Sequence, residues 1–505
     1  MYRLFLAVTF VLTGLTPLNL FGQTPVSSLE RPNVLFIAID DLRAELGCYG
    51  NEVIQSPHLD GLAARGVAFR NQFVTVPTCG ASRYSLLTGK LPRSRRELSN
   101  SIFEARRAAA ARAKQKAGAE NQPESFIEQF RRNGYYTVGI GKISHSADGY
   151  IYGYTNPKGT ELELPHSWDE MLMDAGKWGT GWNAFFAYAD GSNRNDLKNQ
   201  VKPYEKAEVN DEGYPDGLTA ALAVGKLREL ADRDQPFFLG VGFFKPHLPF
   251  NAPAKYWDIY DESDIPITPS PDLPEKVHRA SLHPSDEFNR YLLGEEKASL
   301  DKPVSDAYAR KVRHAYYASV SYTDAQVGKV LAELERLGLD KNTIVVVWGD
   351  HGWHLGDHRV WGKHTIFDWA LRSAFIVRAP GNRPGWVCQD IVSSIDIYPT
   401  LMELCGINVP YRMDGKSFAP LLSGKPPRRW KNVAYSYYRN GISVRTKRYR
   451  LTRYYRDEQP VVELYDHRKD PYGNHNIAGD RPKTVKRLMP LLEKGNTGLY
   501  GGQPK

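Results

Sequence analysis

The sequence predicts an α/β protein, in which a large N-terminal domain with a mainly parallel mixed sheet flanked by helices precedes a smaller C-terminal α+β domain. Apolar strand-like runs alternate with helix-like stretches over most of the 505 residues, which is typical of parallel sheets with helices on both faces. Beyond about residue 425 the strand-like runs become shorter, which favours a small antiparallel sheet. The chain is long enough to bury a sizeable core in each of two domains.

The N-terminal segment has the features of a secretory signal peptide. It carries one Arg, an apolar stretch interrupted by Gly and Pro, and small and polar residues near Gly22. The uninterrupted apolar run is short for a membrane span, so a membrane anchor is the weaker alternative. We therefore expect a signal peptide over 1–22, a large domain over 23–425 and a C-terminal subdomain over 426–505. The mature protein is expected in the periplasm or outside the cell, without stable membrane insertion.

The composition indicates a folded chain with an excess of positive charge. Apolar residues make up 41% and charged residues 24% of the sequence, and the formal net charge is +9. Positive clefts concentrate anionic substrates, although the same charge can belong to a solvated surface. Nucleic acid is a poor partner for an exported chain without a binding motif. Four cysteines are too few for a disulfide framework in a chain of this size.

The first predicted elements follow one another closely. Residues 32–41 form a continuous apolar run that predicts a buried strand, with two Asp residues at its carboxyl end. A helical stretch at 56–66 ends in Gly, and a strand-like stretch at 67–75 follows it. Helical spacing resumes from Ser82, so that Cys79 is expected where a helix begins.

Three further strands are predicted from apolar runs that end in charged residues or histidine, at 135–142, 236–244 and 342–349. A helical stretch precedes the first of them, and a long amphipathic helix at 310–339 precedes the third. Another helix is expected at 393–407. Ligands of open α/β sheets bind at the carboxyl ends of the strands, so the residues that follow these runs are candidates for a functional site.

Four predicted strands end in the same kinds of residue. These are the pairs Asp40 and Asp41, Lys142 and His145, Lys245 and His247, and Asp350 and His351. Cys79, Arg83 and Lys363 are expected beside them. A single acidic pair after a strand is usually a helix cap or a surface feature. The prediction of a functional site therefore depends on several such residues lying at the same edge of one sheet. Three carboxylates suit a hard divalent cation, and Lys and His around it suit sulfate or phosphate as substrate.

Seven segments spread over most of the mature chain carry a family resemblance. They are RPNVLFIAIDDLRAELGCYG, CGASRYSLLTGKLP, NGYYTVGIGKISH, GFFKPHLPF, YYASVSYTDAQVGKVL, VVWGDHGWHLGDHRVWGKH and ELYDHRKDPYGNHNIA. In this order they resemble the formylglycine-dependent sulfatases of the alkaline phosphatase superfamily, and they are most similar to the iduronate-2-sulfatase-like group. The resemblance implies that the domain over 23–425 is a sulfatase catalytic domain.

The resemblance implies a nucleophile and a metal site. In this family, the Cys of a C-x-P/A-S-R segment is oxidised by a maturation enzyme to formylglycine, whose hydrated form attacks sulfur. The modified residue would be Cys79. The implied ligands of a Ca²⁺ ion, or of Mg²⁺ in its place, are Asp40, Asp41, Asp350 and His351, together with residue 79.

The resemblance also implies roles for the cations and histidines around the nucleophile. Arg83 would hold the hydrated residue 79 and offset its negative charge. Lys142 and His145 would stabilise it, with His145 as the base that removes a proton in the last step.

A second group would act on the substrate. His247 would be the general acid for the leaving oxygen, and Lys363 would bind sulfate oxygens and take part in catalysis. The implied substrate-binding residues are Lys142, Lys245, His247 and Lys363.

Two positions depart from the common family pattern. His351 stands where many sulfatases have Asn, and nitrogen is an uncommon ligand for Ca²⁺, so the identity of the metal stays open between Ca²⁺ and Mg²⁺. Ala81 stands where the maturation motif most often has Pro, which leaves open which maturation enzyme acts on Cys79.

The expected substrate is a sulfated carbohydrate, either a polysaccharide or an oligosaccharide, and uronic acid 2-O-sulfate is one candidate. The aromatic, Gly-rich stretch at 168–196 can line a sugar pocket or pack in a core. One alternative function is a phosphomonoester or phosphonate hydrolase of the same superfamily. Another is a catalytically silent protein that binds sulfated glycans.

Overall fold

The computed structural model describes residues 1, 31–113, 123–151, 160–424 and 427–501, and the side chains of 108–113 are left out. Apart from Met1, the predicted signal peptide lies outside the described residues, and so does the predicted boundary at 425 and 426. Both remain predictions. No helix in the described part of the chain is long and apolar enough to cross a membrane.

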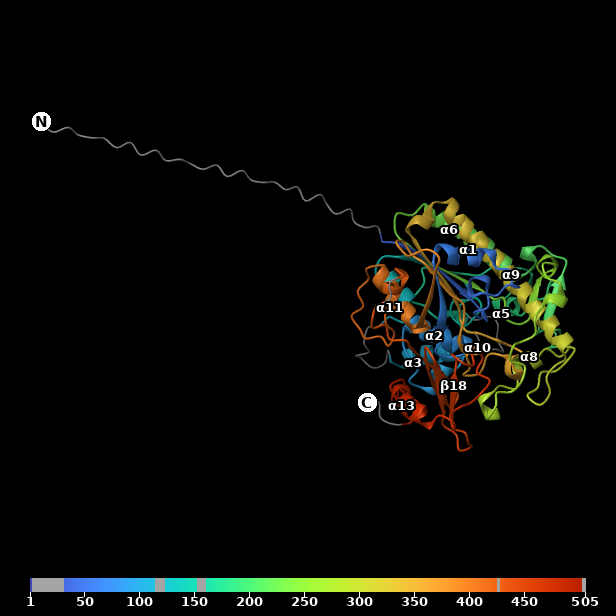
Figure 1. Ribbon diagram of the computed structural model, residues 1–505. Helices are drawn as coiled ribbons and strands as arrows, with labels where there is room; N and C mark the ends of the chain where they lie inside the picture. The colour runs from blue at the N-terminus through green and yellow to red at the C-terminus, as the bar shows by residue number, and fades with distance from the viewer. Residues whose placement is uncertain (2–30, 114–122, 152–159, 425–426, 502–505) are drawn as a thin grey trace.

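An eight-stranded mixed sheet lies at the centre of the larger part of the molecule (Figure 1). Its strand order is β14-β2-β13-β10-β1-β8-β3-β6. The five strands from β10 to β6 are parallel, whereas β13 runs antiparallel to both of its neighbours. The strands are β1 (Asn33–Ile39), β2 (Val67–Phe73), β3 (Tyr136–Gly141), β6 (Glu170–Leu172), β8 (Phe237–Phe243), β10 (Thr343–Gly349), β13 (Phe375–Arg378) and β14 (Trp386–Ser393). The predicted mainly parallel mixed sheet is confirmed.

Helices cover both faces of this sheet. Successive residues of a strand point to opposite faces, so each central strand contributes side chains to two hydrophobic cores. In β1, Leu35, Ile37 and Ile39 belong to one hydrophobic core, and Val34, Phe36 and Ala38 belong to the other. Figure 1 shows the helices of the two layers on either side of the sheet. The first core includes α1 (Pro57–Arg65), α6 (Pro215–Ala231) and α9 (Asp306–Arg336), and the second includes α2 (Cys79–Thr88), α4 (Phe126–Arg132) and α11 (Ile397–Leu404).

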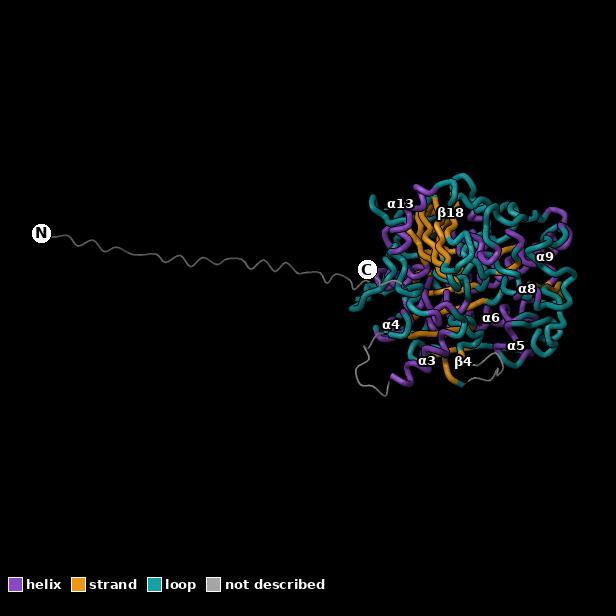
Figure 2. Tube along the Cα trace, turned by 90° about the horizontal axis from the view of Figure 1, so that it is seen from below, coloured by secondary structure: helices purple, strands orange, loops and turns teal. Residues whose placement is uncertain are grey.

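A smaller antiparallel sheet follows, as the sequence predicts. Its four strands pair in chain order, and α13 (Pro482–Glu493) packs beside them at one end of the molecule (Figure 2). The strands are β15 (Val433–Tyr438), β16 (Gly441–Thr446), β17 (Tyr449–Tyr454) and β18 (Val462–Asp466). Val76 and Ala81, which flank Cys79 in the chain, belong to the core of this sheet. The two sheets therefore meet beside the predicted nucleophile.

Shorter elements occupy the connections. They are β4 (Tyr150–Ile151), β5 (Glu161–Leu162), β7 (Tyr204–Ala207), β9 (Phe250–Pro253), β11 (His354–Leu355), β12 (Trp361–Gly362), α3 (Ile102–Ala113), α5 (Gly181–Phe185), α7 (Ala254–Trp257), α8 (Asp286–Asn289), α10 (Asp368–Leu371) and α12 (Ala419–Leu422). Four of these elements, β4, α3, α5 and α8, contribute residues to the cavity described below.

Candidate active site

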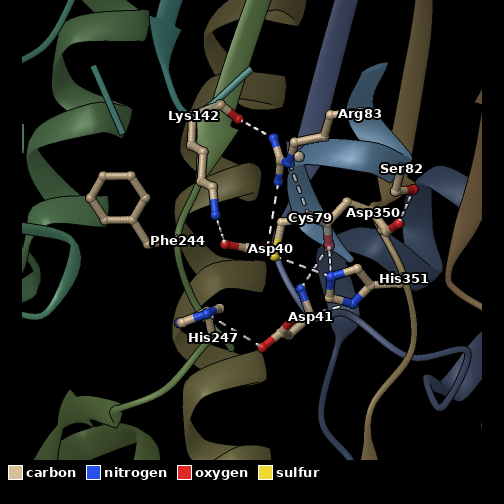
Figure 3. Close-up of polar contacts among 12 residues, drawn as sticks. Asp40, Asp41, Cys79, Ser82, Arg83, Lys142, Phe244, His247, Asp350 and His351 are labelled. Carbon is tan, nitrogen blue, oxygen red and sulfur yellow. Dashed lines mark hydrogen bonds and ion pairs between the residues drawn. The ribbon is translucent and has the colours of Figure 1, made fainter. Parts of the chain in front are cut away.

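The predicted strand-end residues meet at one edge of the large sheet. Strands β3, β8, β1 and β10 are neighbours and run parallel, so their carboxyl ends lie together. Cys79 is the first residue of α2 and points toward the same edge (Figure 3). The residues that follow the four strands are Lys142 and His145, Lys245 and His247, Asp40 and Asp41, and Asp350 and His351.

Four buried side chains offer donor atoms to one point. One ligand atom from each of Asp40, Asp41, Cys79 and His351 lies within 4.8 Å of the other three. The Nδ1 atom of His351 is 3.1 Å from the carbonyl oxygen of Gly352, which can only accept, so Nδ1 carries the proton. The Nε2 atom then directs its lone pair into the cluster, 3.2 Å from the Cys79 sulfur.

This donor set fits a divalent cation. The Oδ1 atom of Asp40 is buried and has no hydrogen-bond partner among the described residues, which leaves a carboxylate oxygen free to act as a ligand. Two carboxylates with one imidazole nitrogen suit Ca²⁺ less well than an all-oxygen set, but they remain ligands for hard cations.

Asp350 lies beside the cluster but is not part of it. Its Oδ1 atom accepts a hydrogen bond of 3.0 Å from the backbone nitrogen of Asp41, and its Oδ2 atom accepts one of 2.9 Å from Nε of Arg83. The Arg83 guanidinium also donates to the carbonyl oxygen of Lys142 and lies 3.7 Å from Oδ1 of Asp40. Arg83 therefore contacts the residues that follow three strands, β1, β3 and β10 (Figure 3).

The two neighbouring aspartates differ in their charge balance. Burial alone would raise the pKa of Asp40, but the positive charges of Lys142 and Arg83 outweigh it and hold this pKa well below its usual range. Burial raises the pKa of Asp41 well above its usual range, and Lys363 and His351 offset only part of that effect. A cation at this point would favour the charged form of both carboxylates.

The environment of Cys79 does not activate a thiolate. Burial raises the pKa of its thiol to about 12, and the negative charge of Asp40 adds to the effect, although Lys363 and Lys142 oppose it. The unmodified side chain is accordingly a protonated thiol in this site, in contrast to the low-pKa cysteines of thiol enzymes.

A cavity of about 970 Å³ opens onto the cluster. Cys79, Lys142, His145, His247 and Lys363 all line it, so five of the predicted catalytic residues face one space. The predicted aromatic stretch has both roles. Its residues Trp182, Phe185, Phe186 and Arg194 line the cavity. Phe185 and Phe186 also belong to a hydrophobic core with Trp178, and Trp168 is buried in another core.

His247 faces the cavity beside Glu287, a carboxylate that also contacts Lys363. Its Nδ1 atom lies 2.6 Å from the carbonyl oxygen of Leu248, so this nitrogen carries the proton of the neutral ring. Its Nε2 atom lies 3.1 Å from Oε1 of Glu287, which in turn lies 3.3 Å from Nζ of Lys363. Burial and the charge of Lys363 lower the pKa of His247 to about 4. Burial and Lys142 lower the pKa of His145 well below its usual range.

Lys245 has surroundings different from those that the sequence predicts. Its Nζ atom donates to the carbonyl oxygens of His247, at 3.0 Å, and Pro249, at 2.6 Å, and the side chain is not among the residues that line the cavity. Burial lowers the pKa of Lys245 to about 8. The side chain supports the loop that carries His247, and the prediction that it binds sulfate has no geometric support here.

Several residues of the cavity have no counterpart in the sequence prediction. They are Glu287 and Arg290 from α8 and the residue after it, Arg194 from the aromatic stretch, and Tyr438 and Arg439 at the end of β15. None follows a strand of the large sheet or belongs to a spaced motif that the sequence analysis used. Among them, only Arg194 had a signal in the sequence, because it lies in the aromatic stretch that can line a sugar pocket.

The chain matches two family models. The model described as Sulfatase matches residues 32–407, and the model described as N-sulphoglucosamine sulphohydrolase, C-terminal, matches residues 356–495. Among curated relatives, iduronate 2-sulfatase of Mus musculus is 30% identical over 429 residues, which cover 78% of this chain and 72% of the relative.

Solved structures are similar over nearly the whole chain. A phosphonate monoester hydrolase from Silicibacter pomeroyi has a TM-score of 0.72 at 25% identity and covers 92% of this chain and 95% of its own. The protein BT4656, in complex with its substrate D-glucosamine-2-N,6-O-disulfate, has a TM-score of 0.67 at 22% identity and covers 92% of this chain and 98% of its own.

The fold and the site together define a hydrolase of the alkaline phosphatase superfamily. Within it, the chain belongs to the sulfatase family and is a sulfuric ester hydrolase, since the Sulfatase model spans most of the chain.

Proposed function

We propose that the protein removes sulfate from a sulfated carbohydrate, through a formylglycine made from Cys79 and with a bound Ca²⁺ or Mg²⁺ ion. The observation that supports this most directly is the convergence of Asp40, Asp41, Cys79 and His351 within 4.8 Å at the floor of a cationic cavity. The family relationship to iduronate 2-sulfatase and the substrate of BT4656 both favour a sugar sulfate.

Asp40, Asp41 and His351 would hold the cation, with Asp350 as a further carboxylate beside them. The bound cation would polarise an oxygen on residue 79 and offset charge on the sulfate. Arg83 orients this end of the site, because it binds Asp350 and lies against Asp40. A hydrated formylglycine at position 79 would provide the hydroxyl that attacks sulfur.

Lys142 and Lys363 would bind the sulfate oxygens. Both line the cavity, and both contact an aspartate of the cluster, Lys142 through Asp40 and Lys363 through Asp41 at 3.1 Å. Their positive charges neutralise the sulfate monoester as it enters and stabilise the charge that develops on its oxygens.

His247 is the proposed acid for the leaving sugar oxygen. In the neutral ring Nδ1 holds the proton, so Nε2 must take up a proton before it can donate one. Glu287, 3.1 Å away, and an anionic substrate both favour that charged form. His145, which lines the same cavity near Lys142, would accept the proton from residue 79.

Mass spectrometry of the tryptic peptide from Asn71 to Arg83, taken from the mature protein, tests the nucleophile. The expected result is an aldehyde in place of the Cys79 thiol. Sulfate release from sulfated disaccharides, compared with phosphate release from an aryl phosphate, tests the reaction. An unmodified Cys79 without sulfate release would refute the proposal and favour a glycan-binding protein, and faster phosphate release would favour the phosphoester alternative.

A further inference from the structure

A buried arginine lines the cavity without an acidic partner. Arg194 is 7% exposed and faces the same space as Cys79 and His247. Within the described part of the chain its guanidinium takes part in no ion pair, and its Nε atom has no hydrogen-bond partner. A buried charge without a counter-charge is costly, so an anion is expected to complete this part of the cavity.

The backbone and two aromatic rings hold Arg194 in position. Its backbone nitrogen donates to the carbonyl oxygen of Phe186 at 3.1 Å, and its carbonyl oxygen accepts from Asn199 at 2.8 Å. The centre of the guanidinium lies 3.5 Å from the centroid of the Phe186 ring and 5.4 Å from that of Tyr291. These cation–π contacts stabilise the charge in part, but they supply no acidic partner, which a carboxylate or a sulfate would provide.

Phe186 also links Arg194 to the reaction centre. The centroid of the same ring lies 6.2 Å from that of His247, the proposed acid for the leaving oxygen. The Phe186 ring therefore contacts both the guanidinium of Arg194 and the imidazole of His247. The cavity that these residues line is large enough to hold a sugar.

We propose that Arg194 binds a second anionic group, a carboxylate or a second sulfate, on the sugar that carries the cleaved sulfate ester. This inference rests on the proposed function and narrows its substrate class to sugars with two negative charges. Arg290 and Arg439, which are exposed and line the same cavity, add positive potential that attracts such substrates.

Binding of matched sugars tests the proposal. The probes are methyl glycosides in three series, with one sulfate ester at carbon 2, 3 or 4. Each series contains a neutral hexose, the corresponding uronate, and a hexose with a second sulfate at carbon 6. Affinities are measured by titration calorimetry in a Cys79→Ala background, in which no sugar is consumed. The variants are Arg194→Ala and Arg194→Gln. The matched control is Arg233→Ala, which removes an exposed guanidinium 3.7 Å from the ring centroid of Tyr136.

In the best-binding series, a dianionic sugar is expected to bind about 10- to 100-fold more tightly than the monoanionic one. This preference should fall to about threefold or less in both Arg194 variants and persist in the control. Preference for the uronate alone identifies a carboxylate, and preference for the disulfate alone identifies a second sulfate. The proposal is overturned if no series shows a preference for the dianionic sugar. It is also overturned if the Arg194 variants bind all sugars more weakly by the same factor, so that the preference is unchanged.

Sulfate release by the chain with its native Cys79 is measured on the same sugars. A chain that selects dianionic sugars through Arg194 but releases no sulfate would support this inference and refute the proposed activity. A chain that releases sulfate without such selection would support the proposed activity and refute this inference. The two failures are therefore distinguishable.

Discussion

The carboxylate of Glu287 lies 3.1 Å from Nε2 of His247, in a cavity that also contains the thiol of Cys79. The same carboxylate oxygen lies 3.3 Å from Nζ of Lys363. Burial would raise the pKa of Glu287, but Lys363 and His247 outweigh it and hold this pKa well below its usual range. Glu287 therefore positions two groups that the proposed reaction uses, while its own side chain comes from the short helix α8.

The first prediction concerns this positioning residue. Glu287→Gln keeps the shape of the side chain but removes the charge that favours a protonated His247. We expect kcat/KM for a sulfated sugar to fall about 10- to 100-fold, less than the loss caused by His247→Ala. If Glu287 acts through His247, the Gln substitution should have little further effect in a His247→Ala background. Equal losses in both backgrounds would contradict this role.

Metal binding is the second prediction. Two buried carboxylates, with an Oδ1 atom on Asp40 that accepts no hydrogen bond from the described residues, should be stabilised by a cation, so chelation should lower the thermal unfolding midpoint and abolish sulfate release. At a cation concentration 100 times the dissociation constant, the stabilisation is about 2.7 kcal/mol. Differential scanning calorimetry with added Ca²⁺ or Mg²⁺ measures it. Asp41→Asn should remove the shift, and a midpoint that does not respond to either ion would refute the metal site.

The reliability of the sequence prediction depended on how each residue is positioned. Asp40 and Asp350 were found because a parallel strand brings its carboxyl end to a known edge, whatever the loops do. Glu287 and Arg194 were missed because they belong to connections, whose path through space no periodicity encodes. Lys245 was placed at the correct strand end, but the direction of its side chain is decided by the carbonyl oxygens of its own loop.

The third prediction concerns the contact between the two sheets. Asp368, on α10, binds the guanidinium groups of Arg445 on β16, at 3.0 Å, and Arg450 on β17. All three groups are largely buried, so Asp368→Asn would leave two cations without a counter-charge and lower the free energy of unfolding by about 3–5 kcal/mol. The matched control Asp272→Asn removes an exposed carboxylate that pairs with the half-buried Arg359, and it should cost less than about 1 kcal/mol.

At low pH the protein should lose the stabilisation that the Asp368 carboxylate contributes to the folded state. Burial would raise the pKa of Asp368, but Arg445 and Arg450 outweigh it and hold this pKa well below 3.8 in the folded protein. A carboxyl with a lowered pKa stabilises the fold above its unfolded pKa, and the effect declines as the pH falls below that value. The stability difference between the parent chain and Asp368→Asn, measured by urea unfolding, should thus be constant near neutral pH and shrink below about pH 4. A difference that grows in acid would contradict the assignment.

The last prediction concerns Lys245 and Lys363, both of which the sequence analysis predicts to bind the substrate. Lys363 lines the cavity and contacts Asp41 and Glu287, so Lys363→Met should lower kcat/KM about 100-fold or more through lost stabilisation of the sulfate oxygens. Lys245→Met instead leaves the carbonyl oxygen of His247 without its donor, whereas that of Pro249 still accepts from the backbone nitrogen of Asn251 at 2.8 Å. The loss should cost about 1–3 kcal/mol of unfolding free energy. Its effect on KM should be small, because its Nζ atom does not face the substrate. Steady-state kinetics with chemical unfolding distinguishes the two outcomes, and a large rise in KM for Lys245→Met without loss of stability would restore it as a sulfate ligand.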